Sequence, residues 1–156
     1  MSCNNRNLLL NGGFRKGQKP WRGRNIVLSD NPIYKNDYSM AMGSASEKNP
    51  SVLFQVVRGP FASECAYYLY FRVLNRSRQN IQPRLVASVS YIDARGKMLR
   101  QTPLLVLPPR MHAHGFKSYF TIVPPPPAAT RTALVLFYAN IGTVMVDYIR
   151  FAAHNV

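Results

Sequence analysis

YYLYFRVL, residues 67–74, and RLVASVSYI, residues 84–92, are the stretches of sequence that decide the fold class. Both are dense in the aromatic and β-branched residues that favour β-strands. The turn after the second stretch reads Asp93-Ala94-Arg95-Gly96, and its glycine suits the positive φ that hairpin turns often require. No part of the chain keeps a helical period with capping residues over several turns. The sequence therefore predicts an all-β protein.

The same strand pattern recurs along the rest of the chain, with turn residues between the segments. Short strands at such intervals, without helices between them, are typical of an antiparallel β-sandwich. Pro103 lies within one of the segments and indicates an edge strand or a break. The predicted strands cover residues 7–10, 24–29, 38–42, 51–57, 67–74, 84–92, 97–106, 116–123, 132–138 and 143–151.

Alternation along these strands sorts their side chains onto two faces. In residues 67–74 every second side chain, beginning with Tyr67, is apolar and is expected to face the core. Tyr68, Tyr70 and Arg72 then share the outer face. Flat aromatic rings stack on sugar rings, whereas amides, hydroxyls and guanidinium groups bind sugar hydroxyls and acidic groups. The sequence predicts a ligand face on one sheet made of Gln55, Tyr68, Tyr70, Arg72, Arg84 and Ser88, with Tyr34 and Tyr138 at its rim.

Charge is the strongest signal in the composition. The 156 residues, about the size of one domain, include 20 Lys and Arg against 6 Asp and Glu, a formal net charge of +14. This imbalance predicts attraction to polyanions such as acidic polysaccharide, nucleic acid or anionic lipid. The apolar runs end well before the roughly 20 residues that cross a bilayer, so no membrane span is expected. No apolar leader segment is recognised near Leu8, and the compartment stays open.

The sequence predicts no catalytic centre, metal site or cofactor. Its 6 acidic residues form no obvious pair for glycoside hydrolysis. His112 and His114 would share one face of a strand, but no third metal ligand is in view, and an exposed loop is favoured. Cys3 and Cys65 lack the spacing of a zinc site, and spacing alone does not establish a disulfide. Two free thiols are therefore the default expectation.

The opening NLLLNGGFRKGQKPWRG, residues 7–23, places glycines and cations between an apolar run and the only tryptophan. It lacks both the GxxxxGK[ST] and the GxGxxG order, and Pro20 disfavours a helix after the loop. A phosphate-binding loop is therefore excluded. The favoured interpretation is a first strand over residues 7–10, a turn at Gly12 and Gly13, and a Trp21 that packs near the sheet edge.

An ordered set of motifs spans residues 7–151. NLLLNGGF and a nearby PW are followed by YSMAMG, VLFQVV, YYLYFRV, YIDARGKML and VMVDYIRF. Together these motifs resemble carbohydrate-binding modules of the cellulose- and xylan-binding jelly-roll type, within the galactose-binding-like β-sandwich group. The resemblance implies an antiparallel jelly-roll domain, which we assign to residues 7–156. Residues 1–6 are expected to form a flexible N-terminus. It also implies a non-catalytic role in binding glycans.

The chain departs from this resemblance where such modules commonly carry acids that help hold a structural calcium ion. Arg15 stands where the family usually has glutamate, and Tyr148 stands where it has the second of two acids beginning at Asp147. Calcium needs several oxygen ligands, so a cation in this place predicts that no calcium is bound. The alignment of motifs also suggests that Asp147 pairs with Arg15. The basic charge disfavours a neutral plant polysaccharide as ligand.

The function predicted from these observations is binding of an acidic glycan, or of a cell- or spore-envelope polymer, without catalysis. A second hypothesis is a structural or assembly protein, a coat or surface-layer component that forms homo-oligomers through apolar outward positions such as Leu134 and Leu136. A third hypothesis is binding of single-stranded nucleic acid by the same tyrosines and arginines, with steep salt dependence.

Overall fold

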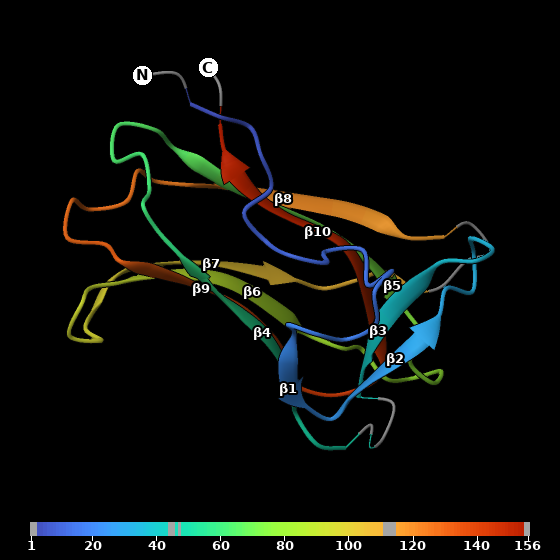
Figure 1. The fold of residues 1–156 in the computed structure, drawn as a ribbon. Helices are drawn as coiled ribbons and strands as arrows, with labels where there is room; N and C mark the ends of the chain where they lie inside the picture. Colours follow the sequence, from blue (N-terminus) through green and yellow to red (C-terminus); the bar gives the residue numbers. More distant parts are fainter. Residues whose placement is uncertain (1–2, 44–45, 47, 111–114, 155–156) are drawn as a thin grey trace.

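The computed structural model describes residues 3–43, 46, 48–110 and 115–154, which form two antiparallel β-sheets packed face to face (Figure 1). Sheet A has the strand order β1-β4-β9-β6-β7, and sheet B has the order β2-β3-β10-β5-β8. Several consecutive strands, such as β3 and β4, lie in opposite sheets, as they do in a jelly roll. The described residues contain no helix that is long and apolar enough to cross a membrane.

Beyond residue 20 most strand bounds agree closely with the sequence pattern. The single strand predicted over residues 24–29 is wrong, because Asn25 has a φ of 54° and the chain there passes from β1 in sheet A to β2 in sheet B. Sheet A consists of β1 (Arg22–Arg24), β4 (Ser51–Arg58), β9 (Thr132–Ala139), β6 (Leu85–Ile92) and β7 (Met98–Val106). Sheet B consists of β2 (Ile26–Asp30), β3 (Tyr38–Met42), β10 (Val144–Ala153), β5 (Tyr67–Asn75) and β8 (Lys117–Val123). The predicted antiparallel sandwich is confirmed, and Pro103 lies in the edge strand β7.

The core lies between the two sheets and follows the predicted alternation. The inward side chains of β5 begin with Tyr67 and Leu69, and those of β6 include Val89 and Tyr91. Trp21 is also buried, with its ring centroid 6.4 Å from that of Phe137 on β9. Burying a large apolar side chain stabilises a fold by about 1.5–3 kcal/mol. The alternating apolar positions therefore supply the main force that holds the sheets together.

The predicted first strand, residues 7–10, is not a strand in the structure. Leu8 does donate one backbone hydrogen bond to Phe151 of β10, at 2.8 Å. The Asn7 side chain takes the neighbouring position, because its Oδ1 accepts from the Phe151 N–H at 3.0 Å. Side-chain amides thus replace a regular ladder of backbone hydrogen bonds. The N-terminal segment of residues 3–10, called the strap below, runs along sheet B.

A disulfide joins Cys3 to Cys65, which corrects the expectation of two free thiols. The Cα atoms are 5.8 Å apart, although the residues are 62 positions apart in sequence. Such a distance is normal for a disulfide. Sequence spacing gave no sign of the pairing, because the strap must first fold along β10 before Cys3 reaches the loop between β4 and β5.

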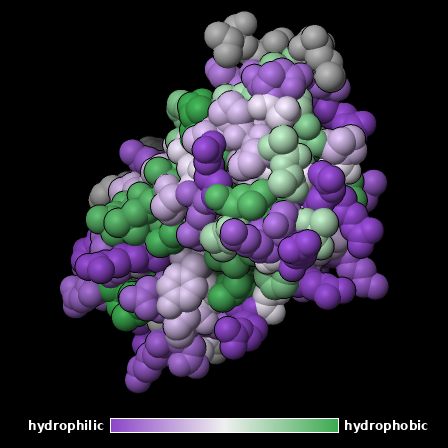
Figure 2. Space-filling model, turned by 90° about the vertical axis from the view of Figure 1, so that its left-hand side faces the viewer, coloured by the Kyte–Doolittle hydropathy of each residue, from purple (hydrophilic) through white to green (hydrophobic). Residues whose placement is uncertain are grey.

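Figure 2 views the end of the sandwich that lies on the left of Figure 1. Hydrophilic side chains dominate this end, and smaller hydrophobic areas lie between them. Apolar atoms normally contribute much of a protein surface, so such scattered areas need no special explanation. The features that point to function lie on the outer faces of the two sheets.

Candidate functional site

The structure divides the predicted ligand residues between the two sheets. Tyr68, Tyr70 and Arg72 lie on β5 in sheet B. Tyr34, in the loop between β2 and β3, is close enough to Arg72 to help raise the pKa of its guanidinium group. The others belong to sheet A or its margin: Gln55, Arg84, Ser88 and Tyr138. The single ligand face predicted from sequence is therefore not formed, because alternation along a strand does not reveal which sheet the strand joins.

Two of the predicted residues in sheet A are closed to a ligand. Gln55 and Ser88 each have only 4% relative exposure. Gln55 accepts a hydrogen bond from the Leu10 N–H at 2.8 Å and donates one to the Leu10 carbonyl at 2.9 Å, so it anchors the strap. Arg84 is exposed just before β6. Tyr138 is 36% exposed on the outer face of β9, on the opposite sheet from Tyr70.

The predicted residues in sheet B form a hydrogen-bonded cluster. Arg72 Nε donates to Tyr70 Oη at 3.0 Å, and Tyr70 Oη shares a 2.8 Å hydrogen bond with Ser118 Oγ on β8. Burial raises the pKa of Tyr70, but the hydrogen bonds with Ser118 and Arg72 outweigh burial and leave the pKa below its usual value. The same bond to Tyr70 raises the pKa of Arg72. This cluster fixes a tyrosine ring beside a permanent positive charge.

Tyr68 is fixed in a second set of contacts on the same face. Arg150 Nε donates to Tyr68 Oη at 2.7 Å, and Tyr68 Oη donates to Asn5 Oδ1 at 2.7 Å. Arg150 also donates to the backbone carbonyl of Asn5. The ring of His154 meets the Tyr68 ring edge-on, with centroids 6.2 Å apart. Side chains that are ordered before binding lose less conformational entropy when a ligand arrives.

A β-bulge in β10 brings Tyr148 to this face. Asp147 pairs with Arg72 and Arg150 pairs with Tyr70, so two residues of β10 lie opposite one residue of β5. Tyr148 has a φ of 52°, which is uncommon for an aromatic residue, and its N–H donates to Asp147 Oδ1 at 2.8 Å. The guanidinium carbon of Arg72 lies 4.2 Å from the Tyr148 ring centroid, a cation–π contact. Strained residues of this kind cluster at binding sites.

A groove of about 590 Å³ lies between the strap and this part of sheet B. Tyr70 and Tyr148 supply its aromatic surface, and none of its lining residues is acidic. A concave site with aromatic walls and a few charged groups is a typical ligand site. This basic groove is lined by Asn7, Leu10, Asn11, Gly12, Gly13, Arg15, Lys16, Lys19, Pro20, Tyr70, Tyr148, Ile149 and Arg150.

Asn11 organises the loop that brings cations to the basic groove. Its Oδ1 accepts from the Lys16 N–H at 3.1 Å, and its Nδ2 donates to the carbonyls of Gly17 at 2.8 Å and Lys19 at 2.9 Å. The backbone carbonyl of Asn11 in turn accepts from Trp21 Nε1 at 3.0 Å. The loop is thus held both by its own asparagine and by a buried tryptophan. This explains how a glycine-containing basic stretch presents its cations in one place.

A second groove, of about 410 Å³, adjoins the first and has no lysine or arginine in its lining. Tyr70 lines both grooves, and Phe120 and Ile122 of β8 supply exposed apolar surface. A chain-like ligand could therefore cross Tyr70 from one groove into the other. This aromatic groove is lined by Asn5, Tyr68, Tyr70, Phe120, Ile122 and His154.

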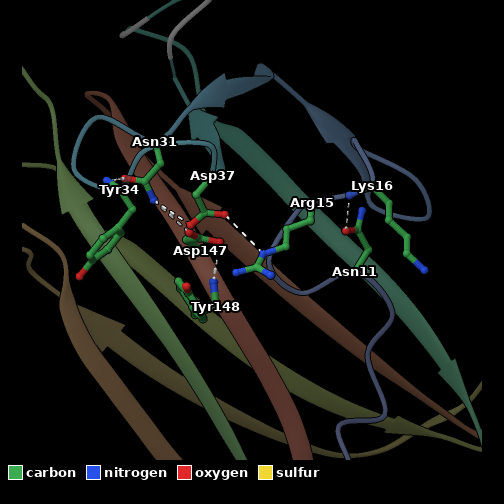
Figure 3. A network of polar contacts seen from close by, with 8 residues as sticks. All are labelled: Asn11, Arg15, Lys16, Asn31, Tyr34, Asp37, Asp147 and Tyr148. Atoms are coloured by element: carbon green, nitrogen blue, oxygen red, sulfur yellow. Dashed lines mark hydrogen bonds and ion pairs between the residues drawn. The ribbon is translucent and has the colours of Figure 1, made fainter.

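Two buried carboxyl groups lie beside the basic groove (Figure 3). Asp147 has no exposed surface and Asp37 is 7% exposed. Asn31 Nδ2 donates to Asp37 Oδ2 at 3.3 Å and to Asp147 Oδ2 at 3.2 Å. Arg15 Nε lies 3.9 Å from Asp37 Oδ1, so the predicted partner, Asp147, was wrong. Arg15 keeps 75% of its side chain exposed and therefore still faces the groove.

The arrangement around these carboxyl groups does not suit a calcium ion. Asn31 presents its Nδ2 donor to both carboxyl groups, and its Oδ1 accepts from the backbone N–H groups of Ile33 and Tyr34. A calcium ligand set needs converging oxygen atoms instead. Within the described parts of the chain, no three or more His, Cys, Asp or Glu side chains gather to hold a metal. His112 and His114 lie outside the described residues, and the expectation of no metal stays a prediction.

Asp147 is expected to make stability depend on pH. Burial, followed by the charge of Asp37, raises the pKa of Asp147 from 3.8 to about 7. The folded state therefore binds more protons than the unfolded state between these values, and stability falls as pH rises through this window. At about 1.36 kcal/mol per pKa unit, the loss between pH 5 and pH 8 is about 2–3 kcal/mol.

Urea unfolding of wild type and Asp147→Asn at pH 5 and pH 8 tests this expectation. The asparagine keeps an oxygen for the Tyr148 N–H but does not titrate. The variant should lose less stability than wild type between the two pH values. Equal losses in the two proteins would show that another group causes the pH dependence.

Sequence reasoning missed several residues of the basic groove, chiefly Lys16, Lys19, Tyr148 and Arg150. The apolar positions of β10 are two residues apart at Val144 and Val146 and again at Ile149 and Phe151. Between Val146 and Ile149 the step is three residues, across Asp147, so the alternation shifts by one. Such a shift in alternation is the sequence signal of a β-bulge. It could have been used to predict that Tyr148 lies on the outer face. No comparable signal identifies the lysines, because their position depends on how the strap folds.

The fold is that of a jelly-roll β-sandwich, and known structures share it over nearly the whole chain. A family 61 carbohydrate-binding module in complex with β-1,4-galactotriose matches with a TM-score of 0.66 and 15% identity, over 96% of this chain and 99% of that chain. The CBM22-1 xylan-binding domain from Paenibacillus barcinonensis Xyn10C matches with a TM-score of 0.67 and 10% identity, over 100% of this chain and 99% of that chain.

A larger protein also contains this fold. The enzymatically active domain of tailspike protein 4 from bacteriophage CBA120 matches with a TM-score of 0.72 and 14% identity. The match covers 95% of this chain but only 21% of the tailspike chain, so the present chain spans about a fifth of its length. No family model matches the sequence, and neither does any curated protein. At these identities the similarity establishes the fold.

Proposed function

We propose that this chain is a non-catalytic glycan-binding module that holds an acidic glycan, such as a cell- or spore-envelope polymer, across the outer face of sheet B. The observation that carries the proposal is the basic groove. Tyr70 and Tyr148 offer aromatic surface there, beside the cations Arg15, Lys16, Lys19 and Arg150. Solved carbohydrate-binding modules with the same fold support this class of function.

The geometry gives each group a role in binding. The tyrosine rings would stack against the apolar face of sugar rings, and Tyr70 would join the ligand segments in the two grooves. Lys16 and Lys19 would attract carboxylate or phosphate groups on the same ligand. Arg72 would act indirectly, since it holds Tyr70 by a hydrogen bond and Tyr148 by a cation–π contact.

The carboxyl groups of the described residues support a binding role without hydrolysis. Glycosidases place two carboxyl groups on either side of the bond they cleave. Here the neighbouring pair, Asp37 and Asp147, is buried and already hydrogen-bonded to Asn31. Disulfides persist in oxidising compartments, so the Cys3–Cys65 bond supports a cell- or spore-surface location.

Replacing Tyr70 by alanine is expected to weaken glycan binding about tenfold or more, because stacking surface is lost in both grooves. A glycan array at low and high salt would first identify acidic ligands. Titration calorimetry would then compare polygalacturonate with its methyl-esterified form, which keeps the sugar chain and loses the charge. Wild type should prefer the charged form, and Tyr70→Ala should weaken binding to it.

Tyr138→Ala is the matched control, because this tyrosine is 36% exposed on the opposite sheet. It should bind like wild type. Loss of binding in Tyr138→Ala with no change in Tyr70→Ala would move the site to sheet A. If single-stranded oligonucleotides bind tightly while no acidic glycan does, the groove serves nucleic acid and the proposal fails.

A further inference from the structure

The outer face of sheet A is apolar across its central strands. Val52, Phe54 and Val56 point outward from β4, and the register places them opposite outward residues of β9. Val56 is 52% exposed, and Leu105 on the edge strand β7 is 60% exposed. Val52, Phe54, Leu134 and Leu136 on this face are half-buried. Large apolar patches on a protein surface mark binding sites. The cross-strand pairs are Val52 with Tyr138, Phe54 with Leu136 and Val56 with Leu134.

A groove of about 470 Å³ is formed on this face where β1 lies against β4. Its floor is apolar, and Arg22 and Arg24 of β1 line it together with Gly23. A side chain at Gly23 would collide with the carbonyl of Val52, so the glycine allows β1 to approach β4 closely. The volume lies within the roughly 300–1,000 Å³ typical of small-ligand sites. Its apolar residues are Val52, Phe54, Leu134 and Leu136.

The charges on sheet A select the kind of occupant. Its strands carry Arg22, Arg24, Arg58 and Arg100, and they contain no aspartate or glutamate. A second copy of this face would bring further arginines into the interface, and its strands would offer no carboxylate to pair with them. A neutral sugar would find few open hydroxyl partners, since Ser88 and Ser90 are only 4% and 2% exposed. An apolar body with a negative end complements the groove.

We propose that this groove binds a single-chain anionic amphiphile, with its acyl or aryl body on Phe54 and Leu136 and its carboxylate or sulfonate between Arg22 and Arg24. The inference does not rest on the glycan-binding role, because the basic groove lies on the other sheet. Shape and apolar area hold the body of the ligand, and the charge-assisted contacts to arginine set its orientation.

Calorimetric titration with sodium decanoate below its micelle concentration tests the proposal on the full chain. Decanol and decyltrimethylammonium are the neutral and cationic comparison ligands, each with an alkyl chain of the same length. Decanoate should bind about tenfold more tightly than decanol, and the cation should bind least. The double variant Arg22→Gln and Arg24→Gln should weaken decanoate binding about tenfold and leave decanol unchanged. Both arginines are exposed, so this variant should fold normally.

Two further variants separate the apolar part of the site from general effects. Leu136→Ser should weaken both decanoate and decanol, whereas Tyr70→Ala, on the opposite sheet, should change neither. The proposal is overturned if decanoate does not bind, or if the arginine variant binds it like wild type. It is also overturned if sedimentation shows a dimer that Leu136→Ser abolishes, which would assign the face to a second copy. Binding to phosphatidylglycerol vesicles without binding to monomeric decanoate overturns it as well.

Discussion

Removing the disulfide with Cys3→Ser and Cys65→Ser is expected to lower the free energy of unfolding by about 4 kcal/mol. The bond closes a loop between residues 62 positions apart, and it restricts the unfolded chain more than the folded one. It also attaches the strap whose later residues form a wall of the basic groove. Urea unfolding followed by circular dichroism would measure the loss.

The reduced wild-type protein is the matched control for this prediction, because it removes the same bond without changing the sequence. Reduced wild type and the double variant should unfold at similar urea concentrations. If oxidised wild type unfolds at the same urea concentration as its reduced form, the bond does not form or does not stabilise the fold. Thiol titration of the unfolded, unreduced protein would distinguish these two outcomes.

Trp21→Ala is expected to destabilise the fold by about 3–5 kcal/mol, the range for removing a large buried aromatic side chain. Trp21 is 1% exposed, and its ring contacts those of Phe14 and Phe137, at centroid distances of 5.7 Å and 6.4 Å. The substitution would leave a cavity at the edge of the core. Circular dichroism must report the unfolding, because Trp21 is the only tryptophan.

Trp21→Phe separates packing from hydrogen bonding at this position. Phenylalanine fills much of the space but leaves the Asn11 carbonyl without the donor that lies 3.0 Å away in the native protein. A loss of about 1–3 kcal/mol is expected. If Trp21→Ala cost no more than Trp21→Phe, the tryptophan would matter through its hydrogen bond and not through its volume.

The sequence was sufficient to predict the strands because their inward positions are apolar at every second residue. Tyr67 and Leu69 on β5, and Val89 and Tyr91 on β6, are all buried as this pattern requires. The pattern failed at residues 7–10, where Asn7 and Gln55 side chains take the place of ladder hydrogen bonds. Local residue types cannot show that a distant side chain will bond to a backbone segment.

The candidate site was predicted only in part, and the reason lies in the sheet topology. Tyr68, Tyr70 and Arg72 share a face because they alternate on one strand, which the sequence displays directly. Ser88 was assigned to the same face from the alternation in residues 84–92 alone, whereas β6 pairs with β7 and β9 in the other sheet. The cations of the basic groove come from a loop whose position depends on the strap, and alternation says nothing about it.

The bulge at Tyr148 restricts how the chain can accept insertions and deletions. Its extra residue shifts the alternation of β10, so that Ile149 and Phe151 continue the inward row begun by Val144 and Val146. Deleting one residue here would move every later side chain of this central strand to the opposite face, so that Phe151 would face water. Natural relatives should therefore keep the length of this strand fixed even where its residues differ. Sequence alignments should place their gaps elsewhere, in the loops at the ends of the sandwich.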